Sequence, residues 1–317
     1  MRLRTAVVGV GYLGRFHAEK YAAHPGAELV GVVDVDPGRA REVAAALGVE
    51  VLADHRALTG RVDCASVAVP TQQHFEVARD LLEAGIDVLV EKPVTTTVGE
   101  AKALVEFAVR GGRVFQVGHL ERFNPAVLML EGLVTQPRFI ECHRLAPFTE
   151  RGTDVDVVLD LMIHDLDVIL SMVQSPLRSV EAVGVPVLTH SVDIANARLR
   201  FANGCIANLT ASRVSMKRER KLRIFQADAY LAVDYGARRV RLCRRQPDVD
   251  GQASLTLEER EVPEGDALES EIDAFLHAVR AREAPAVSGW DGLRALEVAH
   301  VIRESLETEV RAVQAAP

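Results

Sequence analysis

The sequence predicts an α/β protein of two domains, in which a doubly wound parallel sheet is followed by an open, largely antiparallel sheet. Short, continuously apolar runs alternate with longer amphipathic segments in the first third of the chain, at Thr5–Val10, Leu29–Asp34, Cys64–Val69, Val88–Glu91 and Val114–Val117. Strands that are buried on both faces need such runs, and the segments between them supply crossover helices. After Val117, strand-like segments of alternating polarity follow one another directly, which is typical of an antiparallel sheet with one covered face.

Helix signals support the parallel part of this prediction. Pro37 stands at a plausible first helical position before Arg39–Leu47, and Thr97 with Glu100 forms a capping box ahead of Ala101–Arg110. These signals place a crossover helix between successive strands. We therefore expect the first domain to cover residues 1–120 and the second to cover residues 121–317.

The second domain is expected to contain helices as well as its sheet. Its candidate strands are Arg138–Leu145, Ser179–Pro186, Ile194–Phe201, Ile206–Ser212 and Leu222–Ala227. Helical periodicity is found at Asp156–Val173, Leu268–Ala281 and Leu293–Leu306. The two closing helices could pack back on the first domain.

Composition excludes several classes of protein. The 317 residues are 48% hydrophobic, enough for a large core, and carry a formal net charge of −8 at pH 7. That charge offers no field to attract a polyanion, so we expect no nucleic-acid partner. The sequence also lacks the uninterrupted apolar stretch of about 18 residues that a membrane span needs.

Cysteine usage favours a cytoplasmic protein. Four cysteines are scattered along the chain without a CxxC pair, which predicts neither a disulfide framework nor a zinc ribbon. They are Cys64, Cys142, Cys205 and Cys243.

A glycine-rich loop follows the first predicted strand and precedes a helical segment. Its sequence is Gly9-Val10-Gly11-Tyr12-Leu13-Gly14. In the dinucleotide-binding fingerprint of the Rossmann fold, the first glycine allows a tight turn, the second lets the backbone approach a pyrophosphate, and the third lets helix and strand pack closely. A purely structural turn is the alternative, but the strand before and the helix after it favour a dinucleotide site.

A carboxylate stands where such a site needs one. Asp34 ends the second predicted strand, twenty residues after Gly14, and can pair with both hydroxyls of the adenine ribose. It would repel a 2′-phosphate, and Val35 follows it where an arginine would suit that phosphate. We therefore expect NAD rather than NADP. Alternatively, Asp34 could simply end the strand or cap the next helix.

A lysine follows the strand that ends at Glu91. Glu91-Lys92-Pro93 lies at the carboxyl edge of the predicted sheet, where open α/β sheets bind ligands. Partial burial and the charge of an oxidised nicotinamide would both lower the pKa of this amine. It could then donate to, or share a proton with, a substrate hydroxyl. An exposed surface lysine beside a proline is the alternative.

Asp160 and His164 are four residues apart in a predicted helix and so share one face. An imidazole can take the proton that leaves when an alcohol becomes a ketone, and a nearby carboxylate can fix its orientation. Taken alone, His164 fits a satisfied helix histidine better than a catalytic base. Asp156 and Asp167 extend the polar stripe, but no second histidine or cysteine has compatible spacing, so we expect no metal.

Five motifs taken together resemble the Gfo/Idh/MocA oxidoreductases. They are the glycine loop, Val69-Pro70-Thr71-Gln72-Gln73-His74, Glu91-Lys92-Pro93, Arg122-Phe123-Asn124-Pro125 and Asp160-xxx-His164. The resemblance covers nearly the whole chain. It implies a Rossmann domain followed by an α/β domain whose open sheet commonly mediates dimers or tetramers.

The resemblance also assigns roles to individual residues. It makes Lys92 the catalytic lysine, Asp160 the orienting aspartate and His164 the catalytic histidine, all three in contact with substrate. It places Arg122 beside the cofactor or the substrate. Four further positions match residues that lie around the cofactor: Pro70, Thr71, His74 and Glu91. Ile163 departs from the aromatic or small residue that often precedes the histidine, which leaves the local shape of the substrate pocket open.

Within the family, residues 117–125 and 156–170 most resemble the members that oxidise the 3-hydroxyl of UDP-N-acetylglucosamine. A nucleotide sugar needs cations for its diphosphate. The densest basic stretch holds Arg213, Lys217, Arg218, Arg220 and Lys221, although a charged, solvated sheet edge is the alternative reading. We expect an NAD-dependent sugar dehydrogenase; a dehydrogenase of a free sugar or inositol and a non-catalytic NAD-binding sensor are the alternatives.

Overall fold

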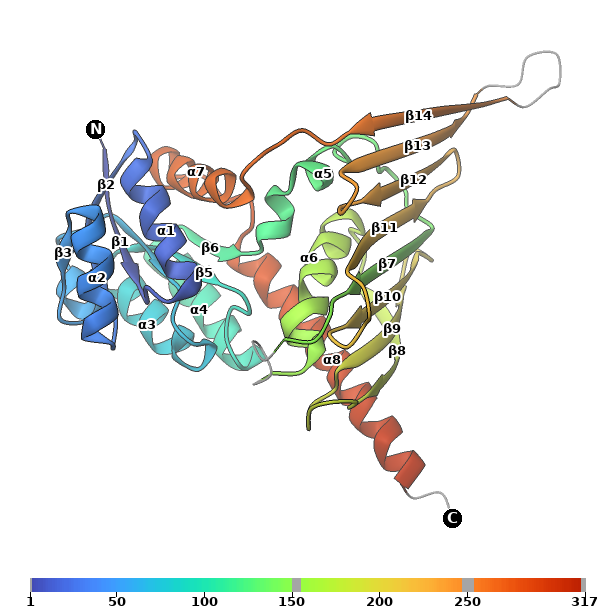
Figure 1. Ribbon diagram of the computed structural model, residues 1–317, viewed down its shortest axis with the longest axis horizontal. Helices are drawn as coiled ribbons and strands as arrows, with labels where there is room; N and C mark the ends of the chain where they lie inside the picture. The colour runs from blue at the N-terminus through green and yellow to red at the C-terminus, as the bar shows by residue number, and fades with distance from the viewer. Residues whose placement is uncertain (1, 150–154, 247–253, 315–317) are drawn as a thin grey trace. The chain divides into compact units, whose positions relative to one another are not determined.

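The computed structural model describes residues 2–149, 155–246 and 254–314 (Figure 1). The chain divides into two compact units. The first comprises Met1–Phe123 and Asp266–Leu296, and the second comprises Asn124–Gly265 and Glu297–Pro317. No helix in the described ranges combines the length and the apolar character that crossing a membrane requires.

The first unit is built on a six-stranded parallel sheet in the order β3-β2-β1-β4-β5-β6. The strands are β1 (Leu3–Val8), β2 (Ala27–Val33), β3 (Glu50–Val51), β4 (Cys64–Val67), β5 (Asp87–Glu91) and β6 (Phe115–Gly118). This is the Rossmann strand order, with its switch point between β1 and β4. The predicted fold class is confirmed here, because each continuous apolar run forms a strand buried on both faces.

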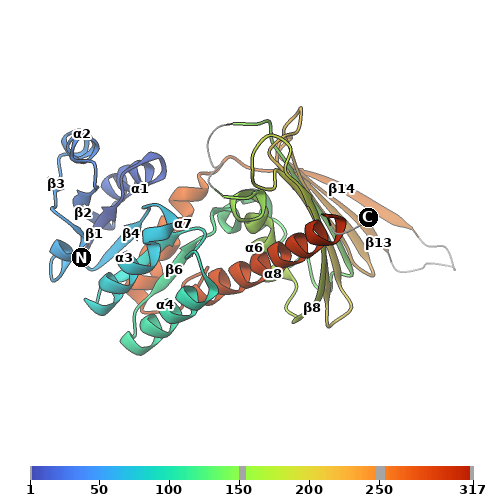
Figure 2. The ribbon, with the colours of Figure 1, turned by 90° about the horizontal axis from the view of Figure 1, so that it is seen from below.

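Crossover helices cover this sheet. They are α1 (Tyr12–Ala23), α2 (Pro37–Leu47), α3 (Thr71–Glu83) and α4 (Val98–Gly111), and a short 3₁₀ turn, η1 (His55–Leu58), precedes β4. α1 packs against α2, whereas α3 packs against α4 (Figure 2). The strand order runs in opposite directions from β1, so right-handed crossovers place these two pairs on opposite faces. The predicted capping box at Thr97 and Glu100 is confirmed.

The core of the first unit is completed from the far end of the sequence. α7 (Ala267–Ala281) packs against α1, and Phe275 joins the apolar cluster that contains Val7, Val32 and Leu89. Phe275 is fully buried, and burying a side chain of that size stabilises a fold by about 1.5–3 kcal/mol. Residues far apart in sequence therefore form one hydrophobic core.

The second unit contains an eight-stranded sheet in the order β14-β13-β12-β11-β7-β10-β9-β8 (Figure 1). Its strands are β7 (Phe139–Leu145), β8 (Leu177–Val185), β9 (Ile194–Phe201), β10 (Ile206–Ser212), β11 (Glu219–Phe225), β12 (Ala229–Asp234), β13 (Arg239–Arg245) and β14 (Leu255–Glu261). β10 pairs with β7 in parallel and the other neighbours pair antiparallel, which confirms the predicted largely antiparallel sheet. Burial alternates along β7, so one face of that strand is covered.

Besides α7 and one π-helical segment, four helical elements follow β6 in the described residues. They are the 3₁₀ turn η2 (Leu120–Phe123) in the first unit, α5 (Pro125–Leu128) and α6 (Ile163–Met172) in the second, and α8 (Gly289–Gln314), whose residues from Glu297 onward belong to the second unit. A π-helical segment, η3 (Val158–Met162), leads directly into α6. The sequence predicts one regular helix over residues 156–173, and the π-helical start differs from that expectation.

Candidate active site

The glycine loop joins β1 to α1 in a conformation that requires glycine. Gly9 has a φ of +84°, and a Cβ atom there would lie 2.7 Å from the carbonyl of Ala68. A Cβ atom on Gly14 would collide with the carbonyl oxygen of Gly9. α1 therefore starts close against the end of β1 and directs its first N–H groups and positive dipole end to this edge. The loop fits the diphosphate of a dinucleotide.

Asp34 is held at the same edge. Its side chain is 3% exposed, Oδ2 accepts a hydrogen bond from Val10 N at 2.8 Å, and Oδ1 accepts one from Asp36 N at 2.9 Å. The N-cap of α2 is Asp36, whose carboxylate accepts from Gly38 N and Arg39 N. Helix capping therefore does not account for Asp34, and its place beside the glycine loop suits a ribose.

A cavity of about 540 Å³ opens beside the glycine loop and Asp34. Its lining residues are Val10, Gly11, Tyr12, Arg15, Arg39, Glu42 and Val43. Tyr12 is 65% exposed, and Leu13 beside it is half-buried. Arg39 Nη1 lies 3.3 Å from Asp34 Oδ1, so a cation stands next to the predicted ribose carboxylate.

The segment after β4 lies against the glycine loop. Ala68 N donates to Val8 O at 2.8 Å, and α3 starts at Thr71 directly after Pro70. His74 is buried, with Nδ1 2.9 Å from Pro93 O and Nε2 2.9 Å from Val69 O. Burial lowers the pKa of His74, although the two carbonyls oppose that shift. The ring thus links the start of α3 to the turn that contains Lys92.

Glu91 and Lys92 follow one another at the carboxyl end of β5. Glu91 pairs in register with Gly118 of β6, where a Cβ atom would lie 3.1 Å from the Glu91 carboxylate. Burial raises the pKa of Glu91, but a hydrogen bond with His17 at 2.9 Å and the nearby charges of Lys92 and His74 bring it below its usual value. Lys92 is half-buried, and its backbone N–H donates to Glu91 Oε2 at 3.3 Å.

In the second unit, Asp160 lies in the π-helical segment η3 and His164 in the first turn of α6. Both side chains are half-buried. π-Helical turns are rare and frequently occur at functional sites. Beside His164, Asp165 is buried in a bidentate pair with Arg144 of β7 at 2.8 and 2.7 Å. This pair fastens α6 to the sheet and limits how far the His164 backbone can move.

Asp156 fixes the start of this helical segment. Its Oδ1 accepts hydrogen bonds from Val158 N at 3.0 Å and from Leu159 N at 3.2 Å. Its Oδ2 lies 2.6 Å from Nε of Arg303, which comes from α8. The sequence places Asp156 on a polar stripe, and the structure uses it as a helix cap.

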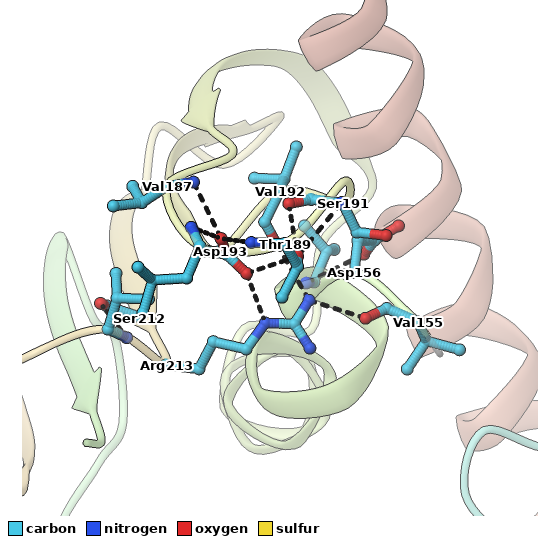
Figure 3. A network of polar contacts seen from close by, with 12 residues as sticks. Val155, Asp156, Val187, Thr189, Ser191, Val192, Asp193, Ser212 and Arg213 are labelled. Atoms are coloured by element: carbon cyan, nitrogen blue, oxygen red, sulfur yellow. Dashed lines mark hydrogen bonds and ion pairs between the residues drawn. The ribbon is translucent and has the colours of Figure 1, made fainter. Parts of the chain in front are cut away.

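A buried ion pair supports the residue before Asp156 (Figure 3). Arg213 and Asp193 are 4% and 0% exposed, and Arg213 Nε lies 3.0 Å from Asp193 Oδ1. Arg213 Nη2 also donates to Val155 O at 2.7 Å and to Val192 O at 3.2 Å. The pair therefore ties the end of β10 to both the start of β9 and the backbone that leads into η3.

This arrangement fits neither of the two readings of the basic stretch for Arg213. Arg213 belongs to the basic stretch proposed for a diphosphate, yet its guanidinium is buried and occupied by Asp193 and two carbonyls. Lys221 is 3.1 Å from Glu219. Within that stretch, Lys217 and Arg218 are exposed. Arg213 supports the fold rather than a ligand, because its charge is already matched inside the protein.

Arg122 lies in η2 of the first unit, where Nη2 is 3.4 Å from Ala286 O. Its segment η2 packs against α7, so Arg122 and Phe123 link the two parts of the chain that form this unit.

Sequence reasoning missed two residues at the edge of the parallel sheet. His17 is fully buried on the inner face of α1 with Gly14, Ala18 and Tyr21. That spacing predicts a buried helix face. A histidine on such a face needs buried polar partners, and this need was the signal that could have identified His17. Arg39 gave no comparable signal, because its contact with Asp34 depends on the direction in which the chain turns from β2 into α2.

Together, the strand order, the glycine loop and Asp34 define an NAD-binding oxidoreductase domain. Residues 3–119 match the family described as "Oxidoreductase family, NAD-binding Rossmann fold", and residues 126–231 match "GFO/IDH/MocA C-terminal domain". UDP-N-acetylglucosamine 3-dehydrogenase of Acidithiobacillus ferrooxidans is 40% identical over 309 residues, which cover 97% of this chain and 98% of that protein. The chain belongs to the Gfo/Idh/MocA oxidoreductase family, as its motifs predict.

Solved structures agree with this assignment. A structure of the Acidithiobacillus ferrooxidans enzyme matches with a TM-score of 0.91 and 39% identity, covering 97% of this chain and 99% of that chain. Inositol 2-dehydrogenase 1 of Saccharopolyspora erythraea is 29% identical over 336 residues, covering 97% of this chain and 95% of that protein. Scyllo-inositol dehydrogenase from Lactobacillus casei, solved with NAD(H) and scyllo-inositol, shares the fold at a TM-score of 0.80 and 20% identity, covering 98% of each chain. The predicted cofactor and enzyme class are confirmed.

Proposed function

We propose that this enzyme oxidises the 3-hydroxyl of a UDP-N-acetylglucosamine-type nucleotide sugar to a ketone. The observation that carries the proposal is the 40% identity to a UDP-N-acetylglucosamine 3-dehydrogenase along 97% of the chain. The inositol dehydrogenase of Saccharopolyspora erythraea, which matches over the same share of the chain, is 29% identical. The full-length likeness therefore favours the nucleotide sugar over the polyol.

In the proposed reaction, Lys92 and His164 act on the same sugar hydroxyl. His164 takes the hydroxyl proton, and Asp160 orients the imidazole for that transfer. Lys92 donates a hydrogen bond to the oxygen and stabilises its developing negative charge. NAD, held by the glycine loop and Asp34, would supply the acceptor for the hydride of the sugar carbon. The proton leaves from the hydroxyl oxygen, and the hydride leaves from the ring carbon. One bound orientation of the sugar can therefore present both atoms to their acceptors.

Support for the cofactor side of this proposal comes from one edge of the first unit. Gly9, Gly14 and Asp34 form the cradle for the diphosphate and ribose, while Thr71 begins α3 at the same edge. Lys92 directly follows β5, which ends at Glu91, so its backbone lies at the edge of the sheet where a dinucleotide binds.

For the diphosphate of the substrate, the candidates are the exposed Lys217 and Arg218. A charge-assisted contact with a phosphate suits either side chain. Replacing both by Ser should raise KM for the nucleotide sugar while leaving the melting temperature unchanged. An unchanged KM would assign diphosphate recognition to other residues.

The direct test is a substrate panel. Purified enzyme is mixed with UDP-N-acetylglucosamine, free N-acetylglucosamine or myo-inositol, each with NAD or NADP, and with or without 2-oxoglutarate as a reoxidant for retained cofactor. We expect loss of two hydrogens from the UDP-sugar alone, measured by mass spectrometry, and NADH absorbance when the cofactor is released. Oxidation of the free sugar or inositol at an equal or higher kcat/KM would refute the nucleotide-sugar assignment.

Two variants test the catalytic assignment. Lys92→Ala and His164→Ala should each lower kcat by at least about 100-fold, the usual contribution of a proton-transfer group, while NAD still binds. Isothermal titration calorimetry measures the NAD affinity. A variant with near-normal turnover would remove its residue from the mechanism.

We also propose that the enzyme is a cytoplasmic homodimer or homotetramer. The family resemblance supports the assembly, and the scattered cysteines support a reducing compartment. Light scattering coupled to size-exclusion chromatography measures the assembly, and a monomer at micromolar concentration would contradict it. Fractionation of the source cells tests the compartment.

A further inference from the structure

A chain of buried polar side chains runs inward from the lysine turn of the first unit. His17 of α1 lies between Ser66 of β4 and Glu91 of β5, with Nδ1 3.1 Å from Ser66 Oγ and Nε2 2.9 Å from Glu91 Oε1. Tyr21, one turn further along α1, places its hydroxyl 2.8 Å from Ser66 Oγ. His17, Ser66 and Tyr21 are all fully buried, so no bulk water competes for these contacts.

When the imidazole is neutral and Glu91 is ionised, one direction satisfies every hydrogen bond of this chain. Burial raises the pKa of the Tyr21 phenol well above its usual value, so the phenol keeps its proton and can donate to Ser66 Oγ. Ser66 can then donate to His17 Nδ1, which leaves Nε2–H to donate to the carboxylate of Glu91. Each hydroxyl thus donates once along the chain. In this arrangement the neutral imidazole is the Nε2–H tautomer, and its N–H points at Glu91.

Glu91 is surrounded by ionisable groups from several elements. His17 comes from α1, His74 from α3, Lys92 from the turn after β5, and Glu271 from α7. Glu271 is fully buried, and its carboxylate lies within 4.8 Å of ligand atoms of His17 and Glu91. A second carboxylate at that distance opposes ionisation of the first. The N–H of His17 works against that effect, because it stabilises a charged Glu91.

We propose that His17 is a positioning residue for the redox site, which acts through Glu91 to set the charge beside Lys92. The Glu91 carboxylate is confined, because it packs against Gly118, where a side chain would crowd it, and its Oε2 accepts a hydrogen bond from Lys92 N. A carboxylate fixed there favours the protonated form of the Lys92 amine, the form that donates to a developing alkoxide. The inference rests on the proposed role of Lys92.

The test compares two replacements of His17. His17→Met fills the space without a donor, whereas His17→Gln keeps an N–H at about the reach of Nε2. Loss of the donor raises the pKa of Glu91, so the carboxylate is protonated at a higher pH. For His17→Met we expect kcat to fall at least about tenfold at neutral pH, and the acidic limb of the pH–kcat profile to move up by about one unit or more. His17→Gln should restore most of the wild-type kcat and most of the wild-type position of the acidic limb.

Further measurements separate positioning from general damage. The NAD dissociation constant and the melting temperature of His17→Gln should match those of the wild type. A matched control is His55→Met, which breaks a partly buried histidine–carboxylate pair, 3.0 Å to Asp80, away from the carboxyl edge of the sheet; its pH–kcat profile should be that of the wild type. If His55→Met and His17→Met shift the profile equally, the inference is overturned.

A spectroscopic measurement on the wild-type enzyme covers the case in which His17→Met does not fold. ¹⁵N NMR of histidine-labelled protein, with the His17 signals assigned by their absence in His17→Gln, should show the Nε2–H tautomer at pH 7.5. An Nδ1–H tautomer would overturn the inference. Lys92→Ala keeps the two proposals distinguishable: an active Lys92→Ala refutes the catalytic role of Lys92, whereas an inactive Lys92→Ala with an unaltered His17→Met refutes only the positioning role of His17.

Discussion

Replacing Arg213 by Met should destabilise the second unit strongly, although Arg213 is remote in sequence from every predicted catalytic residue. The substitution removes the guanidinium and leaves the carboxylate of Asp193 in a site where that side chain is 0% exposed. Breaking a buried ion pair in this way typically costs about 3–5 kcal/mol. Backbone N–H groups of Val187, Leu188 and Thr189 still face Asp193 Oδ2 at 2.6–2.8 Å, so we expect the lower value, about 3 kcal/mol.

Thermal and urea unfolding measure this loss. For a unit of this size each kcal/mol shifts the melting temperature by about 2–4 °C, so the expected decrease is about 6–12 °C. Arg241→Met is the matched control, because its pair with Glu259 at 2.5 Å is exposed. The control should leave the melting temperature unchanged. Equal, small shifts for both variants would refute the reasoning that burial makes the Arg213 pair matter.

The same pair predicts a pH dependence. Burial raises the pKa of Asp193, but hydrogen bonds from the backbone and hydroxyl of Thr189 and from neighbouring N–H groups lower it far below its usual value. The contribution of Asp193 to stability is therefore fully present above the unfolded-state pKa of about 3.9 and is lost as the pH falls through the lower folded-state pKa. In Arg213→Met the folded-state pKa rises, so the acid-unfolding midpoint should move to higher pH. An unmoved midpoint would contradict this account.

Three further substitutions test the first unit. Gly14→Ala places a Cβ atom against the carbonyl oxygen of Gly9 and should weaken NAD binding at least about tenfold by calorimetry, with a stability loss of about 1–3 kcal/mol; wild-type affinity would show that the loop can relax. Asp34→Ser removes the carboxylate beside Arg39 and should raise the NADP-to-NAD ratio of kcat/KM at least about tenfold, since a 2′-phosphate then meets a cation; an unchanged ratio would place cofactor selection elsewhere. Phe275→Ala should cost about 3–5 kcal/mol of the free energy of unfolding, because the side chain is fully buried; a loss below about 1 kcal/mol would mean that α7 is dispensable to this core.

Strands buried on both faces were the most predictable part of the fold. A continuous apolar run such as Val88–Glu91 can satisfy its side chains only inside a covered sheet, and β5 occupies those positions. β3 escaped prediction because its two residues are exposed and carry no apolar pattern. β14 did as well: every residue of Leu255–Glu261 is exposed, so neither face has to be apolar.

The site was predictable where it depends on local sequence and unpredictable where it depends on packing. The Gly9–Gly14 loop follows from backbone geometry that only glycine tolerates, so its sequence is diagnostic. Arg213 shows the opposite case, because its position in a run of basic residues suggests an exposed cation. Its actual surroundings are set by Asp193, twenty residues earlier, and by the backbone carbonyl of Val155. The π-helical turn at Val158–Met162 likewise depends on contacts that apolar periodicity does not encode.

The return of α7 to the first unit has a consequence for synthesis of the protein. While the ribosome is still producing the second sheet, residues 1–123 are complete as a sequence, but the apolar surface that Phe275 covers is still open. The nascent NAD-binding domain therefore lacks part of its hydrophobic core until α7 has been synthesised. Co-translational folding of the first unit therefore cannot be completed by residues 1–123 alone.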